Sequence, residues 1–330
     1  MFIKKHCKDL FLPLLLSITL LTSCAFISDD GNLNSPYPRA AFLDGIVYID
    51  PDGSVSRLTA DSTCETLYTP TGELLGLTAD GEHIYLLERE RSSLPELSRA
   101  VSILRLGANG NVTNLTAEIF ADCEPLHNTL GFIRKIGDKL FVSGASAYGD
   151  AYILDLTTGE ASSAHMPTAN AFIGSNVFFT DGGWEIYSLS LEDISAEPSV
   201  YYDGGDFAGY ADAEFFPGTG IEQLTAGDSL CFSLRDADGY SIYAYDGGAL
   251  ERLHTQKLQV RELLYYGGEL YFSDAAGIYR LGDGEVERIC EVVFCEDDTG
   301  LMQAFNADFA IHDGRLYYDL GELSRYIEVK

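Results

Sequence analysis

The segment DGEHIYLL, residues 80–87, decides the fold, because variants of it return along the chain. The variants are GDKLFVS from Gly137, GSNVFFT from Gly174, GDSLCFS from Gly227, GGELYFS from Gly267 and DGRLYYD from Asp313. Each joins turn-forming residues to a run of aliphatic and aromatic residues, which is typical of a tight turn followed by a strand. A repeat of about 40 to 45 residues that carries several short strands predicts the blades of a β-propeller.

A second pattern lies between these units and consists of two strand-like runs joined by Asp-Gly, Asn-Gly or Gly-Gly. Its copies are VYIDPDGSVSRLT from Val47, ILRLGANGNVTNLT from Ile103, IYAYDGGALERL from Ile242 and IYRLGDGEVERIC from Ile278. Asp-Gly and Asn-Gly accept the positive φ that a tight hairpin requires. Together the two patterns predict four-stranded antiparallel blades, in which the turn-plus-aromatic strand is second and the hairpin forms the outer pair. Helical periodicity is confined to SSLPELSRA, residues 92–100.

The residue pattern of these repeats resembles that of the TolB-like and DUF5050-type propeller families, whose blades alternate the same two patterns. Residues 47–59 and 103–116 resemble the outer hairpin of those families closely, and the resemblance covers roughly residues 40–330. It implies an all-β fold with a single β-propeller. Because such motifs specify strands and turns, the resemblance implies no activity.

The number of blades is left at six or seven. Six complete turn-plus-strand units are visible, and residues 45–59 could complete the last blade, whose third strand is LSRYIEV at residues 323–329. Alternatively residues 40–70 form a short first blade, since AFLDGIVYID resembles FAIHDGRLYYD. With either count we expect the two ends of the chain to pair, because an open ring would expose strand edges.

The amino terminus predicts a lipoprotein signal peptide over residues 1–23. Lys4, Lys5 and Lys8 precede an apolar run over residues 10–21, which is too short for a membrane span. Leu21-Thr22-Ser23-Cys24 follows and resembles the bacterial lipobox, which implies that Cys24 is lipidated. An ordinary cleaved signal is the alternative. Residues 24–39 are then the lipid anchor and a flexible linker, and residues 40–330 are a propeller at the extracytoplasmic face of the cell membrane.

Composition limits the partners that this chain can have. It carries 51 Asp and Glu against 21 Lys and Arg, a net charge of −30, which argues against nucleic-acid binding. Its 46% of hydrophobic residues and 22% of charged residues are typical of a globular domain. We expect a monomer that binds a protein or a glycan, and its charge favours basic partners.

The insertion at residues 201–220 is the predicted contact surface for a ligand, because aromatic and acidic residues are interleaved there. The candidate contacts, with the single tryptophan on a neighbouring turn, are Trp184, Tyr201, Tyr202, Asp203, Asp206, Phe207 and Tyr210. The alternative is that these aromatic residues pack the insertion onto its own blade while the acidic residues face water. A second insertion is predicted at residues 89–98.

The motifs of common hydrolases and nucleotide-binding proteins are absent. The sequence has no H-E-x-x-H, G-x-S-x-G or P-loop, and its six histidines lack metal-ligand spacing. The acidic turns at residues 50–53 and 236–239 are explained by hairpin chemistry without Ca²⁺. Cys290 and Cys295 could form a disulfide, but the odd number of cysteines favours unoxidised buried thiols. We predict no catalytic residues, no metal and no cofactor.

These observations predict an exported, lipid-anchored propeller that acts as a non-catalytic binding or interaction platform at the cell envelope. One alternative is a carbohydrate-active enzyme with its site in the central channel, which predicts carboxylates and histidines clustered at one mouth. A smooth apolar or merely acidic mouth would favour the platform. The other alternative is a scaffold for envelope assembly.

Overall fold

The fold is given by a computed structural model, which describes residues 40–329 apart from some of the connecting segments. The segments left out are 51, 60–62, 92–99, 108–109, 121–129, 145–148, 167–170, 211–219, 283, 292–293, 297–301, 305–308 and 319–324. The predicted signal peptide, Cys24 and the linker therefore lie outside the described residues, and so does most of the predicted helix at 92–100. No helix among the described residues is long and apolar enough to cross a membrane.

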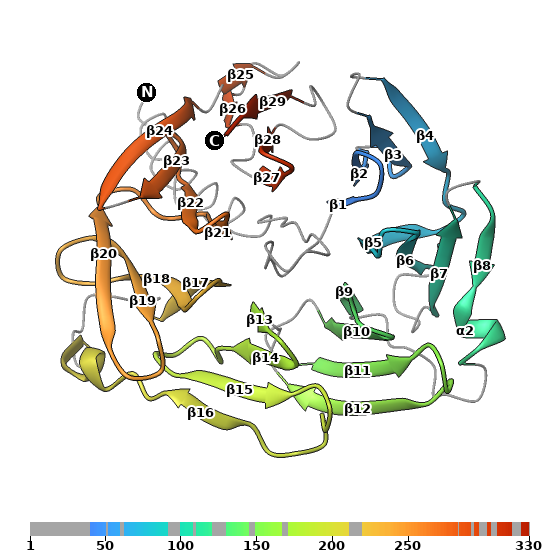
Figure 1. Cartoon of the computed structure of the whole chain (residues 1–330), viewed down its shortest axis with the longest axis horizontal. Helices are drawn as coiled ribbons and strands as arrows, with labels where there is room; N and C mark the ends of the chain where they lie inside the picture. The colour runs from blue at the N-terminus through green and yellow to red at the C-terminus, as the bar shows by residue number, and fades with distance from the viewer. Residues whose placement is uncertain are drawn as a thin grey trace, which may run out of the picture.

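Seven antiparallel sheets are arranged around a common centre (Figure 1), which makes the molecule a seven-bladed β-propeller. The first two blades contain β1 (Ala40–Phe42), β2 (Ile46–Ile49), β3 (Val55–Leu58) and β4 (Cys64–Tyr68), then β5 (Glu73–Ala79), β6 (His83–Arg89), β7 (Val101–Gly107) and β8 (Val112–Asn114). The third and fourth contain β9 (Leu130–Ile136), β10 (Lys139–Gly144), β11 (Gly149–Asp155) and β12 (Ala161–Met166), then β13 (Ala171–Ile173), β14 (Asn176–Phe179), β15 (Ile186–Ser190) and β16 (Ser199–Tyr202).

The remaining blades follow the same order. The fifth and sixth contain β17 (Ile221–Ala226), β18 (Leu230–Arg235), β19 (Tyr240–Tyr245) and β20 (Leu250–Gln256), then β21 (Glu262–Tyr266), β22 (Glu269–Ser273), β23 (Gly277–Gly282) and β24 (Glu285–Glu291). The seventh contains β27 (Phe309–His312), β28 (Arg315–Tyr318) and β29 (Arg325–Glu328). Three further elements lie between blades or follow an outer strand: α2 (Leu115–Glu118), the 3₁₀ helix η2 (Gly205–Tyr210) and the two-stranded sheet of β25 (Phe294–Glu296) and β26 (Met302–Ala304).

The predicted order of strands within a blade is confirmed in the complete blades that carry both patterns. The turn-plus-aromatic units form the second strands β6, β18 and β22, and the Gly-containing hairpins form the outer pairs β7–β8, β19–β20 and β23–β24. Gly110 and Gly247 have φ values of 80° and 94° in two of these outer turns. A residue with a side chain would be strained there, which explains why the sequence places glycine after Asn and Asp.

The interpretation that residues 45–59 complete the last blade is wrong. They belong to the first blade, where VYIDPDGSVSRLT supplies the second and third strands, β2 and β3, instead of the outer pair. The run at 323–329 supplies β29, which pairs with β28 as the third strand of the last blade, as predicted. In the first blade the pattern lies at the second and third strands instead of the third and fourth, because an Asp-Gly turn can join either pair of strands.

The expected strand pairing between the two ends is not seen among the described residues. Instead side chains join the first blade to the sixth and seventh: the rings of Phe42 and His312 stack with centroids 4.1 Å apart. Phe42 also lies 6.1 Å from the ring of Tyr317, and Ile311 and Leu316 of the same cluster are fully buried. Within the described residues, a hydrophobic core between blades therefore closes the ring here.

Buried carboxylates organise the turns that follow the second strands. Asp236 accepts hydrogen bonds from the amides of Asp238 and Gly239, at 2.8 and 3.1 Å, and from the hydroxyl of Tyr243 at 2.8 Å. Asp274 likewise accepts hydrogen bonds from the amides of Ala276 and Gly277. The bonds to Asp236 account for the acidic turn at residues 236–239, and no group of residues suited to a metal ion occurs in the part of the chain that the structure describes.

Candidate functional site

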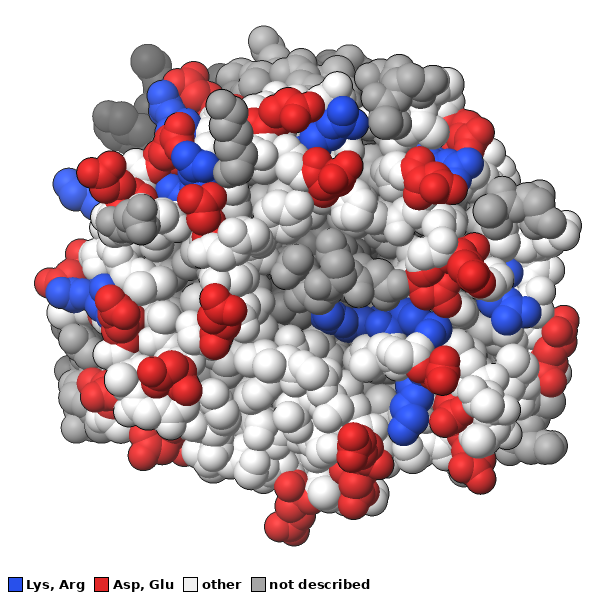
Figure 2. All heavy atoms as spheres, viewed as in Figure 1, with Lys and Arg blue, Asp and Glu red and all other residues white. Residues whose placement is uncertain are grey.

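A hollow with a volume of about 620 Å³ lies at the mouth of the central channel. It is lined by the turns between first and second strands in blades two to five, and by a tyrosine from the sixth blade. Figure 2 shows basic side chains near the centre of a face on which acidic side chains predominate. A volume of this size is typical of small-molecule sites.

One wall of the pocket is basic and comes from β9. Arg134 is only 6% exposed, and the carbon of its guanidinium group lies 4.4 Å from the centre of the Phe172 ring of the next blade. The adjacent Lys135 donates a hydrogen bond to the carbonyl of Gly137, and its ammonium group lies 3.9 Å from Asp80. The rim turns of blades two, three and four therefore hold both cations in place.

Asp80 belongs to the turn between β5 and β6 and is ionised at neutral pH. It accepts hydrogen bonds from the hydroxyl of Tyr85 at 2.7 Å and from the amide of His83 at 2.9 Å. Burial by itself would raise the pKa of Asp80, but these hydrogen bonds and the charge of Lys135 outweigh burial, so the pKa lies below its ordinary value. Asp80 therefore presents a fixed negative charge beside the two cations.

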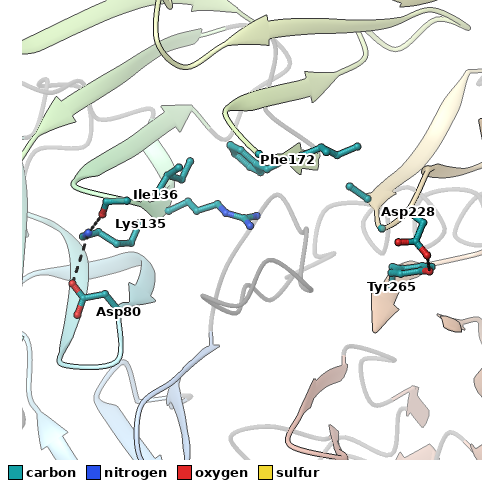
Figure 3. Close-up of a pocket in the computed structure, with 12 residues that line it drawn as sticks. Asp80, Lys135, Ile136, Phe172, Asp228 and Tyr265 are labelled. Atoms are coloured by element: carbon teal, nitrogen blue, oxygen red, sulfur yellow. Dashed lines mark hydrogen bonds and ion pairs between the residues drawn. The ribbon is translucent and has the colours of Figure 1, made fainter. Parts of the chain in front are cut away.

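The opposite wall carries a tyrosine and a second carboxylate (Figure 3). The hydroxyl of Tyr265 donates to Asp228 at 2.8 Å, across the boundary between the fifth and sixth blades. The Tyr265 ring lies directly against Gly227, where a Cβ atom would approach the ring to 2.1 Å. Partial burial, together with the neighbouring Asp228, raises the pKa of Tyr265 above its ordinary value. Gly227 thus provides the space in which the ring stands.

The pocket matches neither of the two mouths that the sequence interpretation distinguished. Its described walls contain two basic side chains, two carboxylates and two aromatic rings, and no histidine. Asp80 and Asp228 lie on opposite sides of the hollow (Figure 3), so the carboxylates do not form a cluster. The mouth is neither a smooth apolar surface nor a purely acidic one.

The aromatic residues predicted as ligand contacts lie mainly in the protein core. Tyr202 and Phe207 are each 3% exposed, and Trp184 and Tyr201 pack against the same cluster between the fourth and fifth blades. The Trp184 ring stacks on Phe207 with centroids 5.4 Å apart. For Tyr202 and Phe207 the packing alternative therefore describes the structure, because a ligand could not reach these rings.

The acidic residues of the same segment face outward or bind their neighbours. Asp203 accepts a hydrogen bond from the amide of Gly205 at 2.9 Å, and Asp206 accepts one from the hydroxyl of Tyr202 at 3.2 Å. The side chain of Tyr210 lies outside the described residues. Ligand contact by Asp203, Asp206 and the half-buried Tyr201 and Trp184 stays a prediction, and the structure places none of them among the residues that line the channel pocket.

Sequence analysis missed Arg134 and Lys135, although a signal for them exists. They lie in FIRKIGDKLFVS, immediately before the repeated turn of the third blade. The first strands of the other blades carry no adjacent pair of basic residues at this position. A comparison of the first strands, instead of the more regular second strands, would have singled out this pair.

Comparisons with known proteins support the fold and nothing finer. No protein-family model and no curated protein matches the sequence of this chain. Among solved structures, the extracellular domain of a putative one-component system from B. thetaiotaomicron is similar, with a TM-score of 0.55, 9% identity and coverage of 90% of this chain and 39% of that one. Sqt1 from Saccharomyces cerevisiae is similar with a TM-score of 0.53, 14% identity and coverage of 88% and 83%.

The class of protein is therefore established at the level of architecture. The chain is a β-propeller protein with a polar pocket at the mouth of its channel. At 9% and 14% identity the two similar structures share only the fold, and the chain spans well under half the length of the first of them.

Proposed function

We propose that this chain is a non-catalytic binding module whose ligand site is the pocket at the channel mouth. The observation that carries the proposal is the convergence of turns from blades two to five, with Tyr265 of the sixth blade, on one hollow that contains charged and aromatic side chains. Rigid strands support each of these turns, so the groups that a ligand would contact are preorganised.

The arrangement of the carboxylates supports binding in preference to hydrolysis. A general acid needs a pKa near the working pH, whereas the pKa of Asp80 is lowered. Asp228 lies on the other side of the pocket (Figure 3) and accepts a hydrogen bond from Tyr265. The two groups therefore lack the division into a proton donor and a neighbouring base that glycoside hydrolysis requires.

The proposal includes export and attachment to the membrane through lipid on Cys24. Its support is the sequence of the leader alone: lysines, a short apolar run and then Leu21-Thr22-Ser23-Cys24. Cys24→Ala is expected to abolish incorporation of labelled palmitate and to release the protein from the membrane fraction. Labelling and membrane retention equal to those of the unchanged protein would contradict the attachment.

The binding site can be tested by saturation-transfer NMR with glucose, glucosamine, glucuronate and trialanine as probes. We expect at least one of these to bind, and we expect Ile136→Trp to prevent it by filling the pocket that Ile136 lines. Val112→Trp is the matched control, since Val112 is 44% exposed on the outer strand β8. Equal signals from the wild type and Ile136→Trp with all probes would overturn the proposed site.

A further inference from the structure

The adjacent cations Arg134 and Lys135 suit an oxyanion. A guanidinium group is planar and presents paired donors that match the two oxygens of a carboxylate, whereas an ammonium group acts as a compact point charge. The Phe172 ring covers one face of the Arg134 guanidinium at 4.4 Å and so fixes its plane. The side chain is 94% buried, since only 6% is exposed, and the entropy lost on binding an anion is correspondingly small.

The carboxylates in the same pocket determine which anion fits. Asp80 and Asp228 give the described walls two negative charges, which balance those of Arg134 and Lys135. A doubly charged phosphate would be repelled by these carboxylates, while a ligand with one negative charge would be repelled less. Ionised carboxylates are acceptors only, so they favour a ligand that also carries hydroxyl donors.

The Tyr265 ring completes the description of the ligand. It lies against Gly227 and borders the hollow on the side of Asp228 (Figure 3), whereas Phe172 is 6% exposed and is covered by Arg134 and Phe132. Aromatic rings pack well against the apolar faces of sugar rings, while hydroxyl groups at the edge of the sugar reach polar side chains. One negative charge, several hydroxyl groups and a flat apolar face are together the properties of a sugar acid.

We infer that the channel-mouth pocket binds a polyhydroxylated carboxylate, namely a uronic acid or a glycan that contains one. The carboxylate lies against Arg134 and Lys135, and the hydroxyl groups face Asp80 and Asp228. This inference rests on the proposed binding function, since it names the ligand class of the same site.

Isothermal titration with glucuronate, glucose and inorganic phosphate tests the inference. Wild-type protein is expected to bind glucuronate at least about tenfold more tightly than glucose or phosphate, because one charge-assisted hydrogen bond contributes roughly that factor. Lys135→Gln is expected to weaken glucuronate binding about tenfold and to leave the weak binding of glucose unchanged. Arg134→Lys keeps the charge and loses the paired donors, so it should weaken glucuronate binding as well.

The control is Lys257→Gln, which removes an exposed positive charge away from the pocket and should change binding less than twofold. Thermal unfolding of each variant shows whether it is folded. If Arg134→Lys does not fold, the result is decided by Lys135→Gln alone. Equal binding of glucose and glucuronate, or tighter binding of phosphate, would overturn the sugar-acid inference while the binding site itself stands. Absence of glucuronate binding to the wild type would also overturn it, and the four-probe NMR experiment then decides separately whether the pocket binds anything.

Discussion

Single carboxylates stabilise individual turns of this ring, and their contribution depends on burial. Asp236 is 5% exposed and accepts hydrogen bonds from the amides of Asp238 and Gly239 and from the buried hydroxyl of Tyr243. Asp228 is exposed and accepts a hydrogen bond from the hydroxyl of Tyr265 near solvent. The same chemical pair therefore occurs once inside the protein and once at its surface.

This difference gives a matched pair of variants. Tyr243→Phe is expected to lower the free energy of unfolding by about 1 to 3 kcal/mol, because a buried acceptor loses its donor. Tyr265→Phe should cost less than about 0.5 kcal/mol, since water replaces the lost hydroxyl. Urea denaturation of the two variants measures both values, and equal losses would show that burial does not distinguish the pairs.

Gly227 can be tested as the residue that makes room for Tyr265. In Gly227→Ala the new Cβ would lie 2.1 Å from the Tyr265 ring, so the ring must move away from Asp228. We expect a loss of roughly 1 to 3 kcal/mol in stability, as for other overpacked sites, together with weaker glucuronate binding. Gly248→Ala is the control, because its nearest contact would be 3.7 Å away and its φ is not positive. Full binding by Gly227→Ala would exclude this role for the glycine.

Alkaline pH should destabilise the ring through its tyrosines. Burial, with a nearby carboxylate, raises the pKa values of Tyr243 and Tyr271 to about 12 in the folded protein, against 10 when unfolded. The folded state therefore holds these protons more tightly, and their stabilising effect is complete below pH 10 and lost as the pH rises from 10 towards 12. Urea midpoints at pH 8, 10 and 11.5 are expected to fall over this interval. The fall should be smaller in Tyr243→Phe, and an identical profile would contradict the assignment.

At the scale of the strands and blades, the boundary between the first and last blades is where the two ends of the chain meet. As at the other blade boundaries, no described strand pairs across it, and it is held by the hydrophobic cluster that contains Phe42 and by the stacking of Phe42 on His312. Because side-chain packing holds the two blades together, each large side chain at this boundary contributes more to stability than one on an outer strand.

Phe42→Ala is therefore expected to reduce the free energy of unfolding by about 3 to 5 kcal/mol, the cost of removing a buried phenyl ring. Phe42 is 6% exposed, whereas Val200 is 54% exposed on the outer strand β16. Val200→Ala is the control and should change stability by less than about 0.5 kcal/mol. A loss below about 1 kcal/mol for Phe42→Ala would indicate that the blades are held together by other means.

The sequence predicted the elements better than their assignment to blades, and the reason is physical. Second strands carry an alternating pattern next to a glycine turn, so DGEHIYLL and its copies could be recognised without knowing their partners. The hairpin at residues 47–59 was placed in the wrong strands, because Asp-Gly turns form wherever two strands meet. Ring closure depends on contacts between residues more than 200 positions apart, such as Phe42 and His312, which no local pattern records.

At the scale of the whole molecule, the ring brings together residues that lie far apart in the sequence. Asp80, Lys135 and Asp228 border one pocket although they belong to the second, third and fifth blades. The sequence instead drew attention to residues 201–210, where aromatic rings are crowded, and Tyr202 and Phe207 proved to be buried. Crowding of aromatic residues indicated packing, whereas the pocket is formed by single residues contributed by each blade.

Arg134 and Lys135 give the pocket at the channel mouth two adjacent positive charges in an acidic molecule. The net charge is −30, and acidic side chains are scattered over the face shown in Figure 2. Basic side chains in a recess surrounded by carboxylates select against large anionic polymers and favour a small ligand that can enter the recess. Selectivity would then come from the shape of the whole ring together with the two cations.

Hydrogen exchange with and without saturating glucuronate tests most directly whether the ring acts as a binding module through its channel mouth. Because one ligand contacts several blades, we expect exchange to slow in all four turns, around residues 80–83, 135–139, 173–176 and 226–230. We expect no change in residues 199–207. Slower exchange confined to residues 199–207, or no change in any of the four turns, would contradict the account.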